Sequence, residues 1–373
     1  MWLKMSAEKG NARAQFLLGS FYDSGKGVKQ DWTEAAKWYQ KAAEQGNDRA
    51  QFLLGILYEC GNGVRQNDEE AAKWYRKAAE LGYAGAQFKL GVCYDFGVGV
   101  EQNHAEAAQW YRRAAEQGDA DAQNNLGACY EYGEGVEKNF VKAAKWYWRA
   151  AKQGFALAQC NLAIRYNKGE GVKQDHVEAA KWFQKAAEQG NARAQYELGC
   201  LYENGVGVEP DFLKAAVLYG EAADQGHLEA RVAIGHCYER GIGVKQNFAE
   251  AAKHYQMAFP CDESQEQLNH ELQVDYLDLA DVEELYRKAT ELEDVYSQAA
   301  LGFLCLHGDG NVECDYDQAF KWFKMAAEQG YALAEYMLGD CYYEGFGVEQ
   351  NYAEATKLYR KAVEQSMPDP SHL

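Results

Sequence analysis

Apolar and small residues recur along the chain with a helical period, in short stretches that end at glycine. Within residues 48–59, Ala50, Leu54 and Tyr58 are four residues apart, which places them on one face of a helix. The Gly-Asn-Gly that follows ends this stretch, because glycine readily adopts the left-handed backbone conformation. A second stretch starts at Asn67 and runs through an Ala-Ala-x-Trp-Tyr-x-x-Ala-Ala block. The pattern predicts two helices, here called helix A and helix B, joined by a glycine loop.

This two-helix pattern repeats along almost the whole chain. Eight units are 36 residues long and one is 37; seven cover 11–262 and two cover 294–366. The rest is a half-unit at 1–10, a degenerate acidic unit at 263–293 and a tail at 367–373. A single helix pair buries too little surface to be stable alone, so the units predict an all-α solenoid built by stacking helix-turn-helix repeats. Repeats 1 to 9 begin at Asn11, Asn47, Tyr83, Asp119, Phe155, Asn191, His227, Asp294 and Tyr331.

Two recurring features predict how the helices start and pack. Each helix B follows an Asn or Asp that we expect to cap it, and Glu or Gln stands three residues later in seven of the nine repeats, as in a reciprocal capping box. Inside helix A, a glycine such as Gly55 recurs at one position, at a cost of roughly 1 kcal/mol each relative to alanine. A cost repeated so regularly predicts close contact with an aromatic side chain of helix B. The expected partners are Trp38, Trp74, Trp110, Trp146, Trp182 and Trp322.

The repeats resemble the Sel-1-like repeat family, a 36-residue relative of the tetratricopeptide repeat. The motif A-x-A-Q-F/Y-x-L-G-x-x-Y-x-x-G-x-G-V, followed by A-A-K-W-Y-x-K-A-A-E-Q-G, is complete from Ala12 to Gly46 and recurs with substitutions. The resemblance implies a right-handed α/α superhelix with helix A on its concave side. It also implies an adaptor that binds proteins or peptides, often in bacteria and also in eukaryotic signalling and membrane-protein quality control.

Charge and hydropathy narrow the classes of partner. The chain has 57 acidic and 38 basic residues and a net charge of −19, which disfavours nucleic acid and anionic membranes. It has no run of 18 apolar residues, and its opening MWLKMSAEKG is too short and polar for a signal peptide. We expect a cytoplasmic protein, although a leader missing from this sequence would hide secretion. The half-unit at 1–10 leaves apolar surface uncovered, which favours weak end-to-end self-association.

The ten cysteines are expected to be small buried side chains. Cys93 and Cys129 occupy one register of helix A, and stacked helices put such positions roughly 8–10 Å apart, beyond disulfide reach. Cys305, His307 and Cys314 are close in sequence but lack the paired C-x-x-C spacing of zinc sites, so Cys305 is expected to be buried and His307 exposed. Neither a metal nor a cofactor is predicted.

An enzymatic alternative comes from the resemblance, because some cysteine-rich relatives carry a β-lactamase or penicillin-binding label. Ser6 and Lys9 match S-x-x-K, but neither S-D-N nor K-T-G accompanies them, and the chain lacks a G-x-S-x-G elbow and a phosphate-binding loop. His104 and His176 follow caps and are expected in solvent, whereas His254 is expected to pack. The sequence therefore predicts no catalytic residue, and a hydrolase is kept as the alternative to a scaffold.

The third, seventh, tenth and fourteenth positions of helix A form a stripe opposite its packing face, and this stripe varies among the repeats. Variation of this kind fits either a binding face or unconstrained surface drift. The thirteenth position, beside the stripe, is acidic in six repeats: Asp23, Glu59, Asp95, Glu131, Glu203 and Glu239. These carboxylates, here called the acidic rail, could attract a basic or amphipathic peptide, or pair with Lys and Arg of the next helix. The predicted partner-binding residues are Lys89, Asp95, Phe96, Asn125, Glu131, Tyr132, Asn161, Lys168, Arg193 and Glu197.

Residues 263–293 depart from the repeat. They lack the glycine loop, and eleven acidic residues lie between Cys261 and Asp294 against Arg287 and Lys288. Pro260 would break the preceding helix. We expect a hinge or an altered helix pair that separates a seven-repeat arm from a two-repeat end, or a second contact site.

Overall fold

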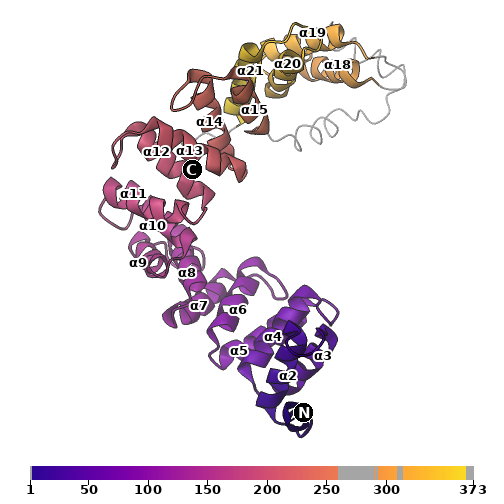
Figure 1. Ribbon diagram of the computed structural model, residues 1–373, viewed down its shortest axis with the longest axis vertical. Coiled ribbons are helices and arrows are strands. Elements are labelled where there is room, and N and C mark those ends of the chain that lie inside the picture. Colours follow the sequence, from indigo (N-terminus) through magenta and orange to yellow (C-terminus); the bar gives the residue numbers. More distant parts are fainter. Residues whose placement is uncertain (1, 259–289, 291–292, 309–313, 367–373) are drawn as a thin grey trace. The chain divides into compact units, whose positions relative to one another are not determined.

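The computed structural model describes residues 2–258, 290, 293–308 and 314–366 (Figure 1). In this part of the chain every regular element is an α-helix, and consecutive helices pack against one another. The predicted all-α solenoid of helix pairs is therefore confirmed. The chain divides into two compact units, Met1–Gln189 and Gly190–Leu373, here called unit 1 and unit 2.

Unit 1 contains a short first helix and the five helix pairs of repeats 1 to 5. Its helices are α1 (Trp2–Glu8), α2 (Ala12–Ser24), α3 (Trp32–Glu44), α4 (Asp48–Cys60), α5 (Asp68–Glu80), α6 (Ala84–Phe96), α7 (His104–Glu116), α8 (Ala120–Tyr132), α9 (Phe140–Lys152), α10 (Ala156–Lys168) and α11 (His176–Ala187).

Unit 2 contains repeats 6 to 9. Its described helices are α12 (Ala192–Asn204), α13 (Phe212–Asp224), α14 (Leu228–Arg240), α15 (Phe248–Ala258), α18 (Val295–His307), α19 (Tyr316–Glu328), α20 (Ala332–Glu344) and α21 (Tyr352–Ser366). The segment 263–289, where we expect a hinge or a contact site, lies outside the described residues.

The helix B caps form as predicted, but the reciprocal half of the capping box is replaced. The side chain of Asn67 accepts a hydrogen bond from the backbone N–H of Glu70, and the equivalent Asn or Asp does so in all nine repeats. The backbone N–H of Asn67 donates to the carbonyl of Tyr58 at 3.0 Å. Because that donor is already satisfied, Glu70 is free to pair with Lys73 at 2.7 Å.

The helix A glycines do meet an aromatic ring, but the tryptophan prediction was wrong by one residue. A Cβ built on Gly91 would lie 2.6 Å from Cδ1 of Tyr111, and the same contact recurs with the tyrosine or phenylalanine that follows the tryptophan position. Successive helix positions differ by about 100°, so only one of two adjacent rings can face the glycine. The tryptophans pack elsewhere: Trp110 joins the cluster that contains Ala78 and Ala79 of the preceding repeat.

The two glycines of each loop have different roles. Gly133 ends α8 in the left-handed conformation, with φ of 84°. Gly135 has φ of 68°, and a Cβ there would lie 2.0 Å from the carbonyl oxygen of His104, in the first turn of the preceding helix B. The loops of repeats 2, 3, 4, 5, 7 and 9 therefore pack directly on the backbone of the preceding helix B.

Buried glutamines link successive helices through one recurring arrangement. Gln87 Nε2 donates to the carbonyl of Ala79 at 3.1 Å, and its Oε1 accepts from Gln117 Nε2 at 2.7 Å. The glutamine-to-glutamine bond recurs in repeats 1, 4, 5, 6 and 8. In repeat 2, Leu81 replaces the donor, and the buried Oε1 of Gln51 has no hydrogen-bond partner.

Unit 2 does not stack its repeats in sequence order. The last helix, α21, packs against α15, and α20, α19 and α18 follow outward from it (Figure 1). The shared core includes Ala252, Tyr255, Tyr359 and Ala362. Polar bonds fix the pairing: Arg360 contacts Glu239 at 2.9 Å, Gln256 donates to Asp340 at 3.0 Å, and Thr356 Oγ1 donates to the carbonyl of Phe248 at 3.0 Å.

Candidate functional site on the helix A face

The predicted partner-binding residues lie on four successive A helices. Eight belong to unit 1, on α6, α8 and α10, while Arg193 and Glu197 lie on α12 of unit 2. Phe96 is 69% exposed and Tyr132 is 64% exposed, and both occupy the fourteenth position of their helix. Lys168 and Arg193 are also exposed. Among the predicted binding residues of unit 1, the exposed ones are therefore Phe96, Tyr132 and Lys168.

The acidic rail is built into the framework. Each of its six carboxylates accepts a hydrogen bond from the tyrosine hydroxyl of its own repeat, as Glu131 does from Tyr147 at 2.7 Å and Asp95 from Tyr111 at 3.1 Å. These are the tyrosines that cover the helix A glycines, and burial together with the neighbouring carboxylate raises the pKa of Tyr147. The rail thus satisfies hydroxyls that packing forces into the core.

Substitutions within the chain support this role. In repeat 5 the ring is Phe183 and the thirteenth residue is Asn167; in repeat 8 they are Phe323 and Leu306. Where the hydroxyl is missing, the carboxylate is missing too. Repeat 9 keeps its tyrosine without an acid at position thirteen, and Tyr359 instead donates to Asp340 at 2.5 Å. The covariation between the thirteenth residue and the helix B ring is visible in the sequence, and it is the signal that could have identified the rail as structural.

Several predicted binding residues are also engaged inside the protein. Lys89 contacts Glu59 at 2.8 Å. Burial alone would raise the pKa of Glu59, but hydrogen bonds from Lys89 and Tyr75 outweigh it, and the pKa is lowered. Glu131 contacts the buried Arg165 at 3.0 Å. Pairing with the next helix, one of the two fates expected for the rail, therefore occurs at these two carboxylates.

Asn125 and Asn161 of the stripe form a short polar chain with the neighbouring Asn124. Asn161 Nδ2 donates to Asn124 Oδ1 at 3.0 Å, and Asn124 Nδ2 donates to Asn125 Oδ1 at 3.3 Å. Asn124 is buried, whereas Asn125 and Asn161 are half-buried. This chain connects α8 to α10 and leaves the two half-buried amides partly accessible.

Three side chains that could hold a metal ion lie close together near the end of α6. The ligand atoms of Asp95, His104 and Glu134 are all within 4.8 Å of one another, and His104 Nδ1 lies 2.8 Å from Asp95 Oδ1. His104, which we expected in solvent, is therefore half-exposed and bonded to Asp95. His176 makes the equivalent contact with Asn167 at 2.8 Å. The shared geometry shows that this histidine also ties helix B to the end of helix A.

The remaining cysteines and histidines mostly have the burial that the sequence predicts. Six of the nine described cysteines are buried, as expected, but Cys60 and Cys314 are exposed and Cys200 is intermediate. Burial raises the pKa of Cys129 to about 12. His307 is exposed and His254 stacks on Tyr238, both as expected.

The hydrolase motif has no supporting geometry. Ser6 lies on α1, but Lys9 follows the end of that helix and is exposed. Neither S-D-N nor K-T-G accompanies the Ser6 and Lys9 pair in the sequence.

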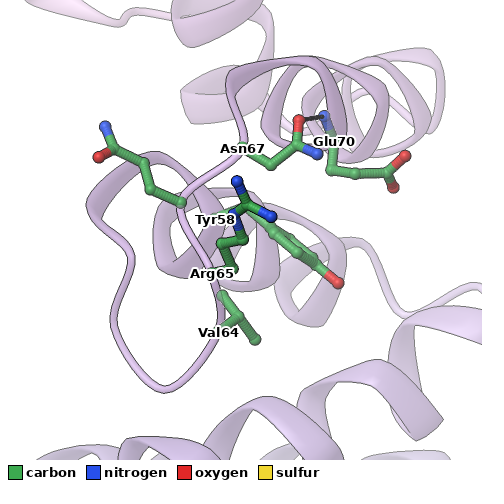
Figure 2. Close-up of a pocket in the computed structure, with 6 residues that line it drawn as sticks. Tyr58, Val64, Arg65, Asn67 and Glu70 are labelled. Atoms are coloured by element: carbon green, nitrogen blue, oxygen red, sulfur yellow. Dashed lines mark hydrogen bonds between the residues drawn. The ribbon is translucent and has the colours of Figure 1, made fainter.

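Figure 2 shows an open depression of about 710 Å³ at the loop of repeat 2, lined by Tyr58, Val64, Arg65, Gln66, Asn67 and Glu70. Asn67 caps α5 by accepting a hydrogen bond from the backbone N–H of Glu70, and Glu70 pairs with Lys73. None of the predicted binding residues lines it. We therefore assign it to the capping structure of the repeat.

The negative charge is divided unequally between the units. Unit 1 has 25 basic and 24 acidic residues, whereas unit 2 has 13 basic and 33 acidic residues. The net charge of −19 therefore belongs to unit 2, and attraction of a partner to unit 1 depends on local charges. Among the described residues, no helix is both long enough and apolar enough to cross a bilayer.

Comparison with known proteins agrees with the helix pairing. A Sel1 repeat model matches residues 12–47, 48–83, 84–119, 120–155, 156–191, 192–227, 228–259, 295–331 and 332–367. A protective antigen of uropathogenic Escherichia coli strains, described as displaying an SLR fold, is 36% identical over 98% of this chain and 83% of its own, with a TM-score of 0.65. A Sel1 repeat protein from Oxalobacter formigenes is 36% identical over 65% of this chain and 96% of its own, with a TM-score of 0.60.

A curated relative matches a shorter part. DAP3-binding cell death enhancer 1 from Rattus norvegicus is 34% identical over 79 residues, which are 21% of this chain. The chain spans 15% of that relative's length. The nine matched repeats cover most of the sequence, and this chain belongs to the Sel1 repeat family.

Proposed function

We propose that this protein is a non-enzymatic scaffold that binds a peptide segment of another protein on the helix A face of unit 1. Sel1 repeat solenoids are commonly protein-interaction scaffolds, and a stack of repeats presents a long row of side chains. The observation that carries the proposal is the exposure of Phe96 and Tyr132 at equivalent positions of α6 and α8. Exposed aromatic side chains are typical anchors for a partner.

The framework defines which residues are available for binding. The rail carboxylates and Lys89 hold the fold together, so Phe96, Tyr132 and the accessible parts of Asn125 and Asn161 supply the contact surface, with Lys168 at its edge. Charge reversal of Glu131 would break its bonds to Tyr147 and Arg165. A test of binding must therefore leave the rail intact.

The test selects twelve-residue peptides from a displayed library on the full-length protein and measures their affinities by fluorescence anisotropy. Phe96→Ala combined with Tyr132→Ala should weaken the selected peptides at least about tenfold, since an anchor contributes about 2 kcal/mol or more. Trp148→Ala is the matched control, because Trp148 is a 45%-exposed aromatic on helix B of the same unit. Selection of no peptide, or equal binding to the parent and the double variant, would refute the proposal.

Self-association is a separate proposal. Trp2 on α1 is 85% exposed and Met5 is 41% exposed. We expect Trp2→Ser to abolish any concentration-dependent increase in mass measured by sedimentation velocity.

A further inference from the structure

Helix α13 of unit 2 exposes apolar side chains where equivalent helices expose charged ones. Residues 213, 217, 220 and 224 are spaced by four, three and four positions, so they form one line along the helix, here called the α13 line. Leu213 is 63% exposed and Val217 is 52% exposed. The α13 line consists of Leu213, Val217, Gly220 and Asp224, whereas the same line on α5 consists of Glu69, Lys73, Arg76 and Glu80.

The α13 line also lacks the cation that this line has in the other repeats. Helix B of each other repeat carries Lys or Arg at the position of Val217 or of Gly220: Lys37, Lys73, Arg112, Lys145, Lys181, Lys253, Lys321 and Lys357. Helix α9 exposes Val141 and Trp148 on its line, but Lys145 lies between them. Asp224 is exposed and, in the described part of the chain, has no Lys or Arg within 4.0 Å. The α13 line therefore combines apolar surface with a negative charge that no cation neutralises.

Gly220 has no packing reason within the protein. A glycine in the interior of a helix lowers the stability of that helix. At Gly199 of α12 the packing requires it, because a Cβ there would lie 2.6 Å from Cε1 of Tyr219. A Cβ built on Gly220 would have no heavy atom within 4 Å. The described part of the chain therefore does not require this glycine, whereas a partner that approaches the backbone of α13 closely would require it.

The partner that fits the α13 line is a helix with a basic flank. A line of residues three and four apart is the surface on which a second helix packs, and two helices approach most closely where a side chain is missing. Packing on Leu213 and Val217 removes apolar surface from water. A Lys or Arg beside the apolar face of the incoming helix can pair with Asp224. Unit 2 has 33 acidic and 13 basic residues, so its charge attracts a basic segment and repels a second copy of itself.

We propose that the α13 line docks a basic amphipathic helix of another protein, with the closest approach at Gly220. This surface belongs to a helix B of unit 2, whereas the proposed peptide site belongs to the helices A of unit 1. The two proposals rest on different residues, so each can fail without the other.

The experiment selects helical peptides of about 18 residues from a displayed library on the full-length protein and measures their affinities by fluorescence anisotropy. We expect the selected helices to carry Lys or Arg beside an apolar stripe. Gly220→Arg places on the α13 line the residue that α5 and α7 have there, and it should weaken binding at least about tenfold. Gly220→Ala should weaken binding about threefold or more, because one methyl group already prevents the closest approach. Asp224→Asn should weaken binding about threefold and reduce its dependence on salt.

Three controls separate docking from folding and from general charge. Gly220→Ala and Gly220→Arg should not lower the midpoint of urea unfolding, because both residues favour a helix more than glycine does and the site is open. Gln184→Arg adds the same charge at the equivalent position of α11 and should bind within about twofold of the parent. The variant that combines Phe96→Ala with Tyr132→Ala should also bind within about twofold, since it changes only the proposed site of unit 1.

Three results would overturn the proposal. Selection of no helix, or equal binding of the selected helices to the parent and to Gly220→Arg, would refute docking on the α13 line and leave the peptide site of unit 1 standing. Selection of acidic helices would contradict the charge argument. A concentration-dependent increase in mass of the protein alone, abolished by Gly220→Arg and retained in Trp2→Ser, would assign the α13 line to a second copy of this chain.

Discussion

We predict that Leu81→Gln stabilises the protein, because a glutamine at this position can donate a hydrogen bond to the unpartnered Oε1 of Gln51. In six other repeats the residue at this place is a glutamine that donates to the buried glutamine of helix A. The backbone at Leu81 has φ of −76° and ψ of −4°, close to −81° and −4° at Gln117. The new side chain therefore starts from a conformation that already makes this bond elsewhere.

The expected gain in stability follows from the one hydrogen bond that is added. Satisfying a buried acceptor gains about 1 kcal/mol after the loss of side-chain freedom, and Leu and Gln differ little in helix propensity. Leu81 is 58% exposed, so its removal sacrifices little buried apolar surface. One kcal/mol corresponds to about a fivefold change in the opening equilibrium of the repeat.

Native-state hydrogen exchange on the full-length protein is the assay, because repeat arrays open locally and a single unfolding midpoint averages over repeats. Amides of α4, α5 and α6 should exchange about fivefold more slowly in Leu81→Gln. Gln117→Leu is the reverse substitution in the next repeat and should accelerate exchange in α6, α7 and α8 by a similar or larger factor. If Gln117→Leu accelerates exchange while Leu81→Gln has no effect, the unpartnered oxygen does not limit stability.

Three further predictions test the packing and the buried groups. Gly91→Ala should lower the free energy of unfolding by about 1–3 kcal/mol in urea denaturation, because its Cβ would lie 2.6 Å from the ring of Tyr111. The control is Ala163, which occupies the equivalent position of repeat 5, where the ring is Phe183; Ala163→Gly should cost about 1 kcal/mol. Burial raises the pKa of Asp340 from 3.8 to about 6, so the folded state binds more protons between these values and α21 becomes less stable as pH rises through them. Above pH 6, amides of α21 should therefore exchange more slowly in Asp340→Asn than in the parent, corresponding to a gain in opening free energy of at most about 3 kcal/mol. Below pH 3.8 this difference should vanish. An equal difference above pH 6 and below pH 3.8 would show that ionisation of Asp340 is not its cause. Burial also raises the pKa of Cys129 to about 12, so iodoacetamide should label the exposed Cys60 first, and comparable labelling of both by mass spectrometry would count against this burial.

Local features of the fold were predictable from the sequence. A cap such as Asn67 bonds a backbone N–H three residues later, and the apolar residues of a helix face recur every three or four residues. Short stretches of sequence are therefore enough to predict both features. The contact between Gly91 and Tyr111 was predicted in kind but assigned to the wrong ring, because Trp110 and Tyr111 are adjacent and recur together. The absence of the acidic residue in the repeats with Phe183 and Phe323 identifies the correct ring.

The stacking order of unit 2 could not be predicted in this way. Repeat periodicity describes neighbours along the chain, whereas α15 and α21 are joined by contacts across about a hundred residues, such as Thr356 to Phe248. Thr356 and Val363 nevertheless stand where the helices B of repeats 1 to 6 have alanine, and both are buried. Repeat 8 also departs from alanine, at Phe320, so such a departure alone does not identify which helices pack together.

The arrangement of α15 and α21 has a consequence for synthesis. A ribosome releases repeat 7 well before Tyr352–Ser366, so the alanine-rich side of α15 emerges without its cover. Repeat 7 therefore lacks this cover until Tyr352–Ser366 has been synthesised, and nascent chains stalled before Tyr352 present this side of α15 to chaperones.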